Sequence, residues 1–166
     1  MANVNSTWIG NAVATPIVLT SPAASVGVLK EASSAATTLA AQAANDTVRL
    51  VRVPSNARIS QVLLSCADAT TGGAINIGIW QTVENGGAVV DADLFASAVD
   101  LTGGPMEHLD VTFESDEYTY AESAKPLWEV LGLSADPNRE YDVVAEVSTT
   151  FNGGPTALAL KVRYVA

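Results

Sequence analysis

Apolar and polar residues alternate with a period of two through much of the chain after Asp46, and this pattern predicts β-strands. Residues 75–80 show it most clearly, because three isoleucines at every second position fall on one face. Residues 48–53 and 58–66 are rich in β-branched and other apolar side chains and predict two further strands. Roughly six to eight short strands separated by glycine-rich turns predict a mainly β fold, a jelly-roll-like β-sandwich.

The end of the chain predicts a β-hairpin with one apolar and one polar side. Every second residue in 141–147 is apolar, and the same alternation returns in residues 158–164. Between the two runs lies the sequence Asn-Gly-Gly-Pro at residues 152–155, which is typical of a turn. We therefore expect these two strands to pair directly with each other.

Two short helices are expected to interrupt the strands. Asp93 could cap a helix over residues 94–99, since its carboxylate can accept hydrogen bonds from the free N–H groups of a first turn. A second helix is expected over about residues 126–131, because Pro126 suits a first turn and Gly132 marks the end.

The first 45 residues differ in composition from the rest of the chain. They contain a single aromatic residue, Trp8, two charged residues, and many Ala, Ser, Thr and Val. Pro16 and Pro22 interrupt any regular element there. The sequence therefore predicts an extended N-terminal arm over residues 1–45, with one or two short strands, and a β-sandwich domain over residues 46–166.

The net charge of −10 is unevenly distributed along the chain. Residues 84–146 carry 15 acidic and two basic residues, whereas the remaining positions carry six basic and three acidic ones. Because an anionic surface repels phosphates, we expect no nucleic acid as a partner. No apolar run reaches the roughly 18 residues that a membrane span needs, so no membrane association is expected. Residues 1–11 show no signal-peptide pattern, which favours folding in a reducing compartment.

Residue types that support catalysis are scarce. His108 is the single histidine and is expected in an exposed loop, while Cys66 ends an apolar run and is expected to be buried. A zinc site needs several such ligands, so we expect no enzyme activity, no cofactor and no metal. One alternative stays open, which is that carboxylates hold Ca²⁺ or contain a glycosidase pair. The candidates are Asp91 with Asp93, or the group Asp110, Glu114, Asp116, Glu117 and Glu122.

Several segments resemble a recurring group of tailed-phage virion proteins. They are residues 51–60 (VRVPSNARIS), the Gly-Gly turn at 72–73, residues 75–80 (INIGIW), residues 86–96 (GGAVVDADLFA) and residues 141–145 (YDVVA). The resemblance spans roughly residues 46–166, and residues 1–45 carry no matching motif. The family is that of capsid decoration (cement) and related virion structural proteins of tailed bacteriophages.

This resemblance implies a protein that binds the outside of the major-capsid lattice and stabilises it by bridging neighbouring subunits. Its partners would be the major capsid protein and neighbouring copies of itself, in a dimer or trimer. It would be made in the cytoplasm of the host bacterium and end on the exterior of the virion capsid. The expected partner-binding residues lie in the arm and are Trp8, Ile9, Pro16, Ile17, Val18 and Leu19.

An alternative function is a carbohydrate-binding or receptor-binding module of a phage head or tail fibre. This hypothesis requires a platform of exposed aromatic rings on which sugars can stack. The candidate rings are Trp80, Tyr118, Tyr120 and Trp128. Most aromatic residues are instead expected in the core or in an interface.

Overall fold

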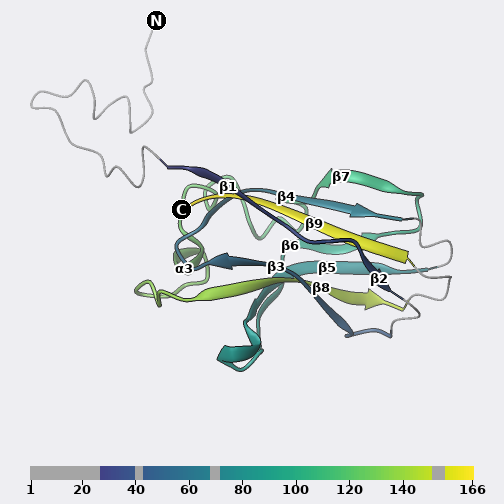
Figure 1. Cartoon of the computed structure of the whole chain (residues 1–166), viewed down its shortest axis with the longest axis horizontal. Helices are drawn as coiled ribbons and strands as arrows, with labels where there is room; N and C mark the ends of the chain where they lie inside the picture. Colours follow the sequence, from purple (N-terminus) through teal and green to yellow (C-terminus); the bar gives the residue numbers. More distant parts are fainter. Residues whose placement is uncertain (1–26, 40–42, 68–71, 151–155) are drawn as a thin grey trace, which may run out of the picture.

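The computed structural model describes residues 27–39, 43–67, 72–150 and 156–166, and these form two antiparallel β-sheets packed face to face (Figure 1). Sheet A has the order β1-β9-β4-β7, with the short β2 also paired to β9. Its strands are β1 (Leu29–Ser33), β2 (Thr37–Leu39), β4 (Arg58–Cys66), β7 (Met106–Asp110) and β9 (Thr156–Val165). Sheet B has the order β3-β8-β5-β6. Its strands are β3 (Thr47–Pro54), β5 (Ala74–Gln81), β6 (Val89–Asp100) and β8 (Glu140–Thr149).

The order of the strands is that of a jelly roll. The chain changes sheet at every connection from β2 onward except the one between β5 and β6, which are neighbours in sheet B. Two antiparallel sheets connected by such crossings form the Greek keys of a jelly-roll sandwich. The predicted fold class, a mainly β jelly-roll-like sandwich, is confirmed.

The core lies between the inner faces of the two sheets. The three isoleucines of β5 are fully buried there, as the alternation in residues 75–80 predicts. Alternate residues of β4 and β9 in sheet A point into the same core: Val62, Leu64, Leu158, Leu160 and Val162. From sheet B, β8 contributes Val143, Ala145 and Val147. The burial of Cys66 is also as predicted.

The predicted hairpin between residues 141–149 and 158–164 is wrong. β8 pairs with β3 and β5 in sheet B, whereas β9 pairs with β1, β2 and β4 in sheet A. The apolar sides of the two strands face each other across the core instead of lying in one sheet. Alternation defines which face of a strand is buried, but it does not define the neighbouring strand.

The predicted helix over residues 94–99 is also wrong, because these residues belong to β6. Between the pairs Ile77↔Ala96 and Ile79↔Asp91, four residues of β6 lie opposite Gly78. A Cβ atom on Gly78 would stand 2.2 Å from the backbone oxygen of Asp91, so only glycine allows this close approach. The bulge turns Leu94 and Phe95 into the core, and this burial outweighs the local helix signal.

The second predicted helix is present as the short α3 (Leu127–Val130), preceded by Pro126 in an extended conformation. Residues 29–39, which the sequence assigned to the arm, contain β1 and β2 and are hydrogen-bonded to β9. Residues 1–26 lie outside the described residues, so the arm remains a prediction there. Within the described residues, no helix is both long enough and apolar enough to cross a membrane.

Candidate binding surface

The hairpin that joins β5 to β6 exposes apolar side chains. Its tip, residues 82–90, begins with the 3-10 helix η1 (Val83–Asn85) and turns through Gly86 and Gly87, both with positive φ. The exposed fractions of Val83, Val89 and Val90 are 66%, 56% and 39%. Figure 1 shows the tip, in teal, extending away from sheet B on the side opposite sheet A. The tip is therefore an apolar projection on the outer side of the sandwich.

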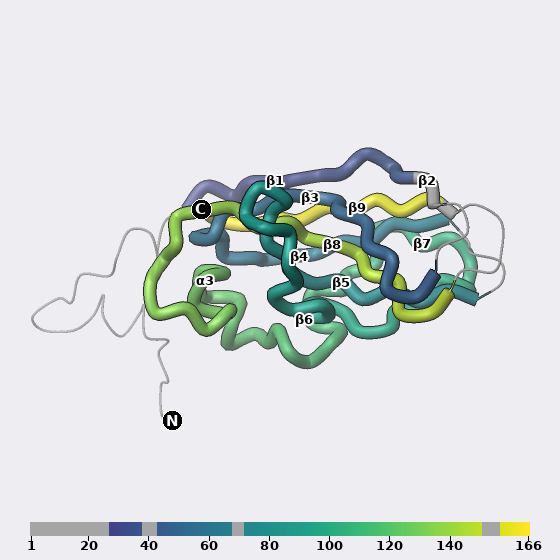
Figure 2. Tube along the Cα trace, turned by 90° about the horizontal axis from the view of Figure 1, so that it is seen from below, coloured from purple at the N-terminus to yellow at the C-terminus, as the bar shows by residue number. Residues whose placement is uncertain are grey.

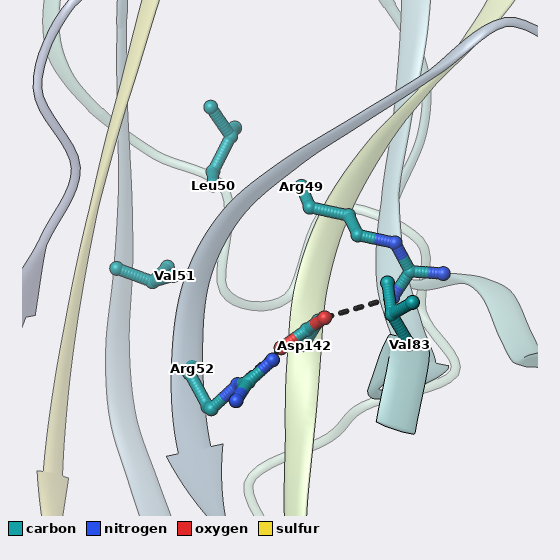
Figure 3. Close-up of a pocket in the computed structure, with 6 residues that line it drawn as sticks. All are labelled: Arg49, Leu50, Val51, Arg52, Val83 and Asp142. Atoms are coloured by element: carbon teal, nitrogen blue, oxygen red, sulfur yellow. Dashed lines mark hydrogen bonds and ion pairs between the residues drawn. The ribbon is translucent and has the colours of Figure 1, made fainter. Parts of the chain in front are cut away.

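Arg49 on β3 fixes this tip to the body of the sheet. Its Nη1 donates to the backbone oxygen of Gln81 at 2.8 Å and to Asp142 Oδ2 at 2.8 Å. Its Nη2 donates to the backbone oxygen of Gly87, also at 2.8 Å. Figure 3 shows the Arg49 guanidinium beside Asp142 on β8. One planar guanidinium thus connects both ends of the turn to Asp142, which restrains the orientation of the tip.

Asp142 is the buried centre of this arrangement, with 6% of its side chain exposed. Its second oxygen accepts from Arg52 Nε at 2.7 Å, and Arg52 Nη2 also donates to Glu84 on the tip at 3.2 Å. The hydrogen bond to Asp142 raises the pKa of Arg52, so its charge is fixed at any ordinary pH. Two arginines, the buried Asp142 and the exposed Glu84 therefore neutralise one another at the base of the tip.

A shallow depression of about 260 Å³ lies beside the tip. Its lining residues are Arg49, Leu50, Val51, Arg52, Val83 and Asp142. Because both arginines already bind Asp142 and other acceptors, the depression does not offer free positive charge for an anionic ligand.

A group of three carboxylates lies elsewhere on the protein, at β6 and the segment that follows β7. The oxygen atoms of Asp91, Asp93 and Glu117 all lie within 4.8 Å of one another. The negative charges of Asp91 and Asp93 raise the pKa of Glu117. Carboxylate oxygens are the ligands that Ca²⁺ prefers, so these three are the described residues that could hold such an ion. The sequence proposed Asp91 with Asp93 and placed Glu117 in a separate candidate group, and the structure brings these three residues together.

The other predicted carboxylates have separate partners. Asp110 accepts from Gln61 and from the backbone N–H and hydroxyl of Thr112, and Glu122 accepts from the Thr119 hydroxyl. Glu114 accepts from the backbone N–H of Ser97 at 2.7 Å. Some of these hydrogen bonds close local turns, while those to Ser97 and Gln61 join separate segments, and the structure does not bring these carboxylates together as one cluster.

The four aromatic residues of the alternative hypothesis do not form one exposed platform. Trp80 and Tyr118 are buried, Trp128 is half-buried, and Tyr120 alone among the four is exposed, by 86%. The Tyr118 hydroxyl donates to the backbone oxygen of Ile59 at 2.8 Å, and burial raises its pKa. Tyr118 also contacts the ring of Phe95 with centroids 5.1 Å apart, so it is a core residue. The burial of Trp80 and Tyr118 agrees with the expectation that most aromatic residues lie in the core, and these two rings cannot belong to the platform that the alternative hypothesis requires.

The structure describes His108 but not the predicted partner-binding residues of the arm. His108 is exposed, as expected, but it lies on β7 and not in a loop. The six partner-binding residues predicted in the arm, from Trp8 to Leu19, lie outside the described residues. Sequence reasoning missed the valines of the tip, although the adjacent pair Val89-Val90 just after an Asn-Gly-Gly turn could have pointed to exposed apolar residues.

No family model and no curated protein matches the chain. Among solved structures, a chain of the cyanophage Pam1 capsid asymmetric unit is similar, with 13% sequence identity and a TM-score of 0.46. The match covers 84% of this chain and 85% of that chain. A likeness at this level does not assign a function to the protein described here.

Proposed function

We propose that this protein is a capsid decoration (cement) protein that binds the outside of a phage capsid lattice and bridges neighbouring subunits without any catalysis. The observation that carries the proposal is the restrained apolar tip at residues 82–90. Exposed apolar residues on a rigid support are typical of surfaces that bind other proteins. The resemblance of residues 46–166 to phage virion proteins supplies the kind of partner.

The tip gives one contact, and the arm would give a second. A stable protein interface buries about 800 Å² on each partner, which is more than three valines can supply. Residues 1–26 contain no Asp, Glu, Lys or Arg, so they can lie on another protein without burying a charge. Two linked contacts raise the effective concentration of each other, and a bivalent subunit binds more tightly than either contact does separately.

The restraint of the tip contributes to affinity in this proposal. A loop that must become ordered on binding loses conformational entropy, and this loss weakens the complex. Arg49 holds both ends of the turn before any partner arrives. The valines are therefore held in a fixed arrangement before binding. Less of the free energy of burial is then offset by ordering the loop, so the affinity is higher.

The experiment is co-sedimentation of the purified protein with undecorated capsids of the parent phage. We expect saturable binding by the full chain. Replacing both Val83 and Val89 with Ser should weaken this binding by about tenfold or more, because tenfold corresponds to about 1.4 kcal/mol and the burial of two valines contributes more than that. Tyr120→Ser is the matched control, because it removes an exposed side chain outside the tip.

Deletion of residues 1–20 should also weaken attachment while leaving the sandwich folded by circular dichroism. Two results would contradict the proposal. One is an absence of binding by the full chain at micromolar concentration, after which a glycan screen would test the fibre-module alternative. The other is unchanged binding by both the double variant and the deletion, which would place the contact elsewhere.

A further inference from the structure

The uneven charge of the sequence becomes a division between two sides of the sandwich. Residues 89–124 contain nine acidic residues and no lysine or arginine. In contrast, the three strands β1, β3 and β9 together contain five basic residues and one acidic residue: Lys30, Arg49, Arg52, Lys161, Arg163 and Glu31. Figure 2 shows β1 and β3 along one side of the molecule and β6 along the other. Because Asp142 and Glu84 neutralise Arg49 and Arg52, the net positive charge of these strands lies on β1 and β9, whereas residues 89–124 are anionic.

Both ends of sheet A are open strand edges within the described residues. There β1 is hydrogen-bonded to β9, β7 is hydrogen-bonded to β4, and neither has a second strand partner. A strand edge presents unpaired N–H and C=O groups that can pair with another strand. Apolar residues accompany both edges, since Leu29 on β1 and Leu109 on β7 are exposed by 62% and 41%.

The charges beside the two edges are opposite in sign. Near the β1 edge lie Lys30 and the ion-paired group of Glu31 with Lys161 and Arg163, which leaves two positive charges. The β7 edge carries two negative charges, Glu107 and Asp110. Within the described part of the chain, neither Lys30 nor Glu107 has an ion-pair partner. The unpaired backbone groups of one edge could therefore hydrogen-bond to those of the other, and the two edges carry opposite net charges.

We propose that copies of this chain associate head to tail, with the β1 edge of sheet A in one copy paired to the β7 edge of sheet A in the next. Strand pairing would extend sheet A from copy to copy, as in β-strand addition. Because the two surfaces differ, the contact is heterologous, and repetition closes into a ring or continues as a chain. Charge complementarity selects this pairing, since two β1 edges or two β7 edges would repel each other.

This contact does not depend on attachment to a capsid, so it is tested with the full chain in capsid-free solution. Sedimentation velocity is recorded over a range of protein concentrations at about 50 mM and about 500 mM salt, which shortens the Debye length roughly threefold. We expect association at micromolar to high-micromolar concentration that weakens at the higher salt. A chain that stays monomeric at both salt concentrations would overturn the proposal.

The decisive test uses two charge reversals, Lys30→Glu and Glu107→Lys. Each variant alone cancels the net charge of one edge, so self-association should weaken by about tenfold or more. In an equimolar mixture, the unaltered β1 edge of the Glu107→Lys variant meets the unaltered β7 edge of the Lys30→Glu variant. The mixture should therefore form heterodimers with the affinity of the original contact. A mixture that associates no better than the separate variants would overturn the proposal.

Two controls exclude other causes. Glu129→Lys reverses an exposed charge on α3, away from both edges, and should leave association unchanged. Deletion of residues 1–20 tests whether the first residues of the chain cover one edge instead of a second copy. If that deletion abolishes association while the charge reversals leave it intact, the arm and not the β1–β7 contact joins the copies, and the proposal is wrong.

Discussion

The strands β8 and β6 both pair with β5, one on each side, yet they differ in almost every other respect. β8 follows β5 over eight residue pairs with a single register shift, and seven of its ten residues are buried or half-buried with an apolar core face. β6 shows three register shifts against β5 and includes the bulge opposite Gly78. β8 is organised for packing, while β6 and the tip before it are organised for display of valines and carboxylates at the surface.

The largest expected effect tests the packing side of this comparison. Val143 on β8 is fully buried between the sheets, so Val143→Asp would place an unpaired carboxylate in the core. We expect a loss of about 4 kcal/mol or more, enough to unfold a domain of ordinary stability. Urea denaturation followed by circular dichroism measures it.

Thr149→Asp is the matched control, because it adds the same charge to the exposed end of the same strand. That variant should change the free energy of unfolding by less than about 0.5 kcal/mol. A folded Val143→Asp protein with native stability would mean that the other face of β8 is the one directed into the core.

This contrast also explains how much of the fold the sequence could predict. The isoleucines of β5 and the alternate residues of β8 and β9 are buried as expected, because alternation encodes the buried face of each strand directly. The direct pairing of β8 with β9 is wrong, because strand order depends on which sheet each connection enters. That choice is made by the packing of the whole sandwich and leaves no mark in a two-residue period.

The conformation of β6 and the groups that it displays at the surface were harder to predict, for two physical reasons. Residues 94–99 suit a helix by capping and composition, but the burial of Leu94 and Phe95 in a bulge decides the conformation. The sequence assigned Glu117 to a different candidate group from Asp91 and Asp93, because only the fold brings its distant segment beside β6. Likewise, no local pattern relates Arg49 to the turn that it restrains.

The second prediction tests whether β8 and the tip are linked through Arg49. Arg49→Ala removes the donors to Gln81, Gly87 and Asp142, and it leaves three acceptors with fewer hydrogen bonds. We expect a loss of about 1–3 kcal/mol, since Asp142 is buried while Arg49 is partly exposed. Hydrogen exchange in residues 81–90 should become faster, because the turn loses its attachment to sheet B.

Arg52→Ala sharpens this test. It removes the ion pair to Asp142 and the exposed contact with Glu84 on the tip, which contributes little, but it leaves the Arg49 hydrogen bonds to the backbone of the turn in place. Exchange in residues 81–90 should then stay close to that of the unmodified protein. Equal exchange rates in the two variants would show that Arg49 does not restrain the tip.

The smallest expected effect concerns the carboxylates that the β6 bulge displays. Asp91 and Asp93 raise the pKa of Glu117 in the folded state above its ordinary value of 4.5. The folded state therefore binds this proton more tightly than the unfolded state, and stability must rise as the pH falls through the folded pKa toward 4.5. Glu117→Gln should be slightly more stable at pH 7, by less than about 0.5 kcal/mol because the group is exposed to solvent.

The difference in stability between the variant and the unmodified chain should shrink as the pH is lowered and under high salt. Thermal unfolding measures this difference, with Glu129→Gln as the control. A Glu117→Gln protein less stable than the unmodified chain at pH 7 would show that the carboxylate makes a favourable contact that outweighs the repulsion from β6.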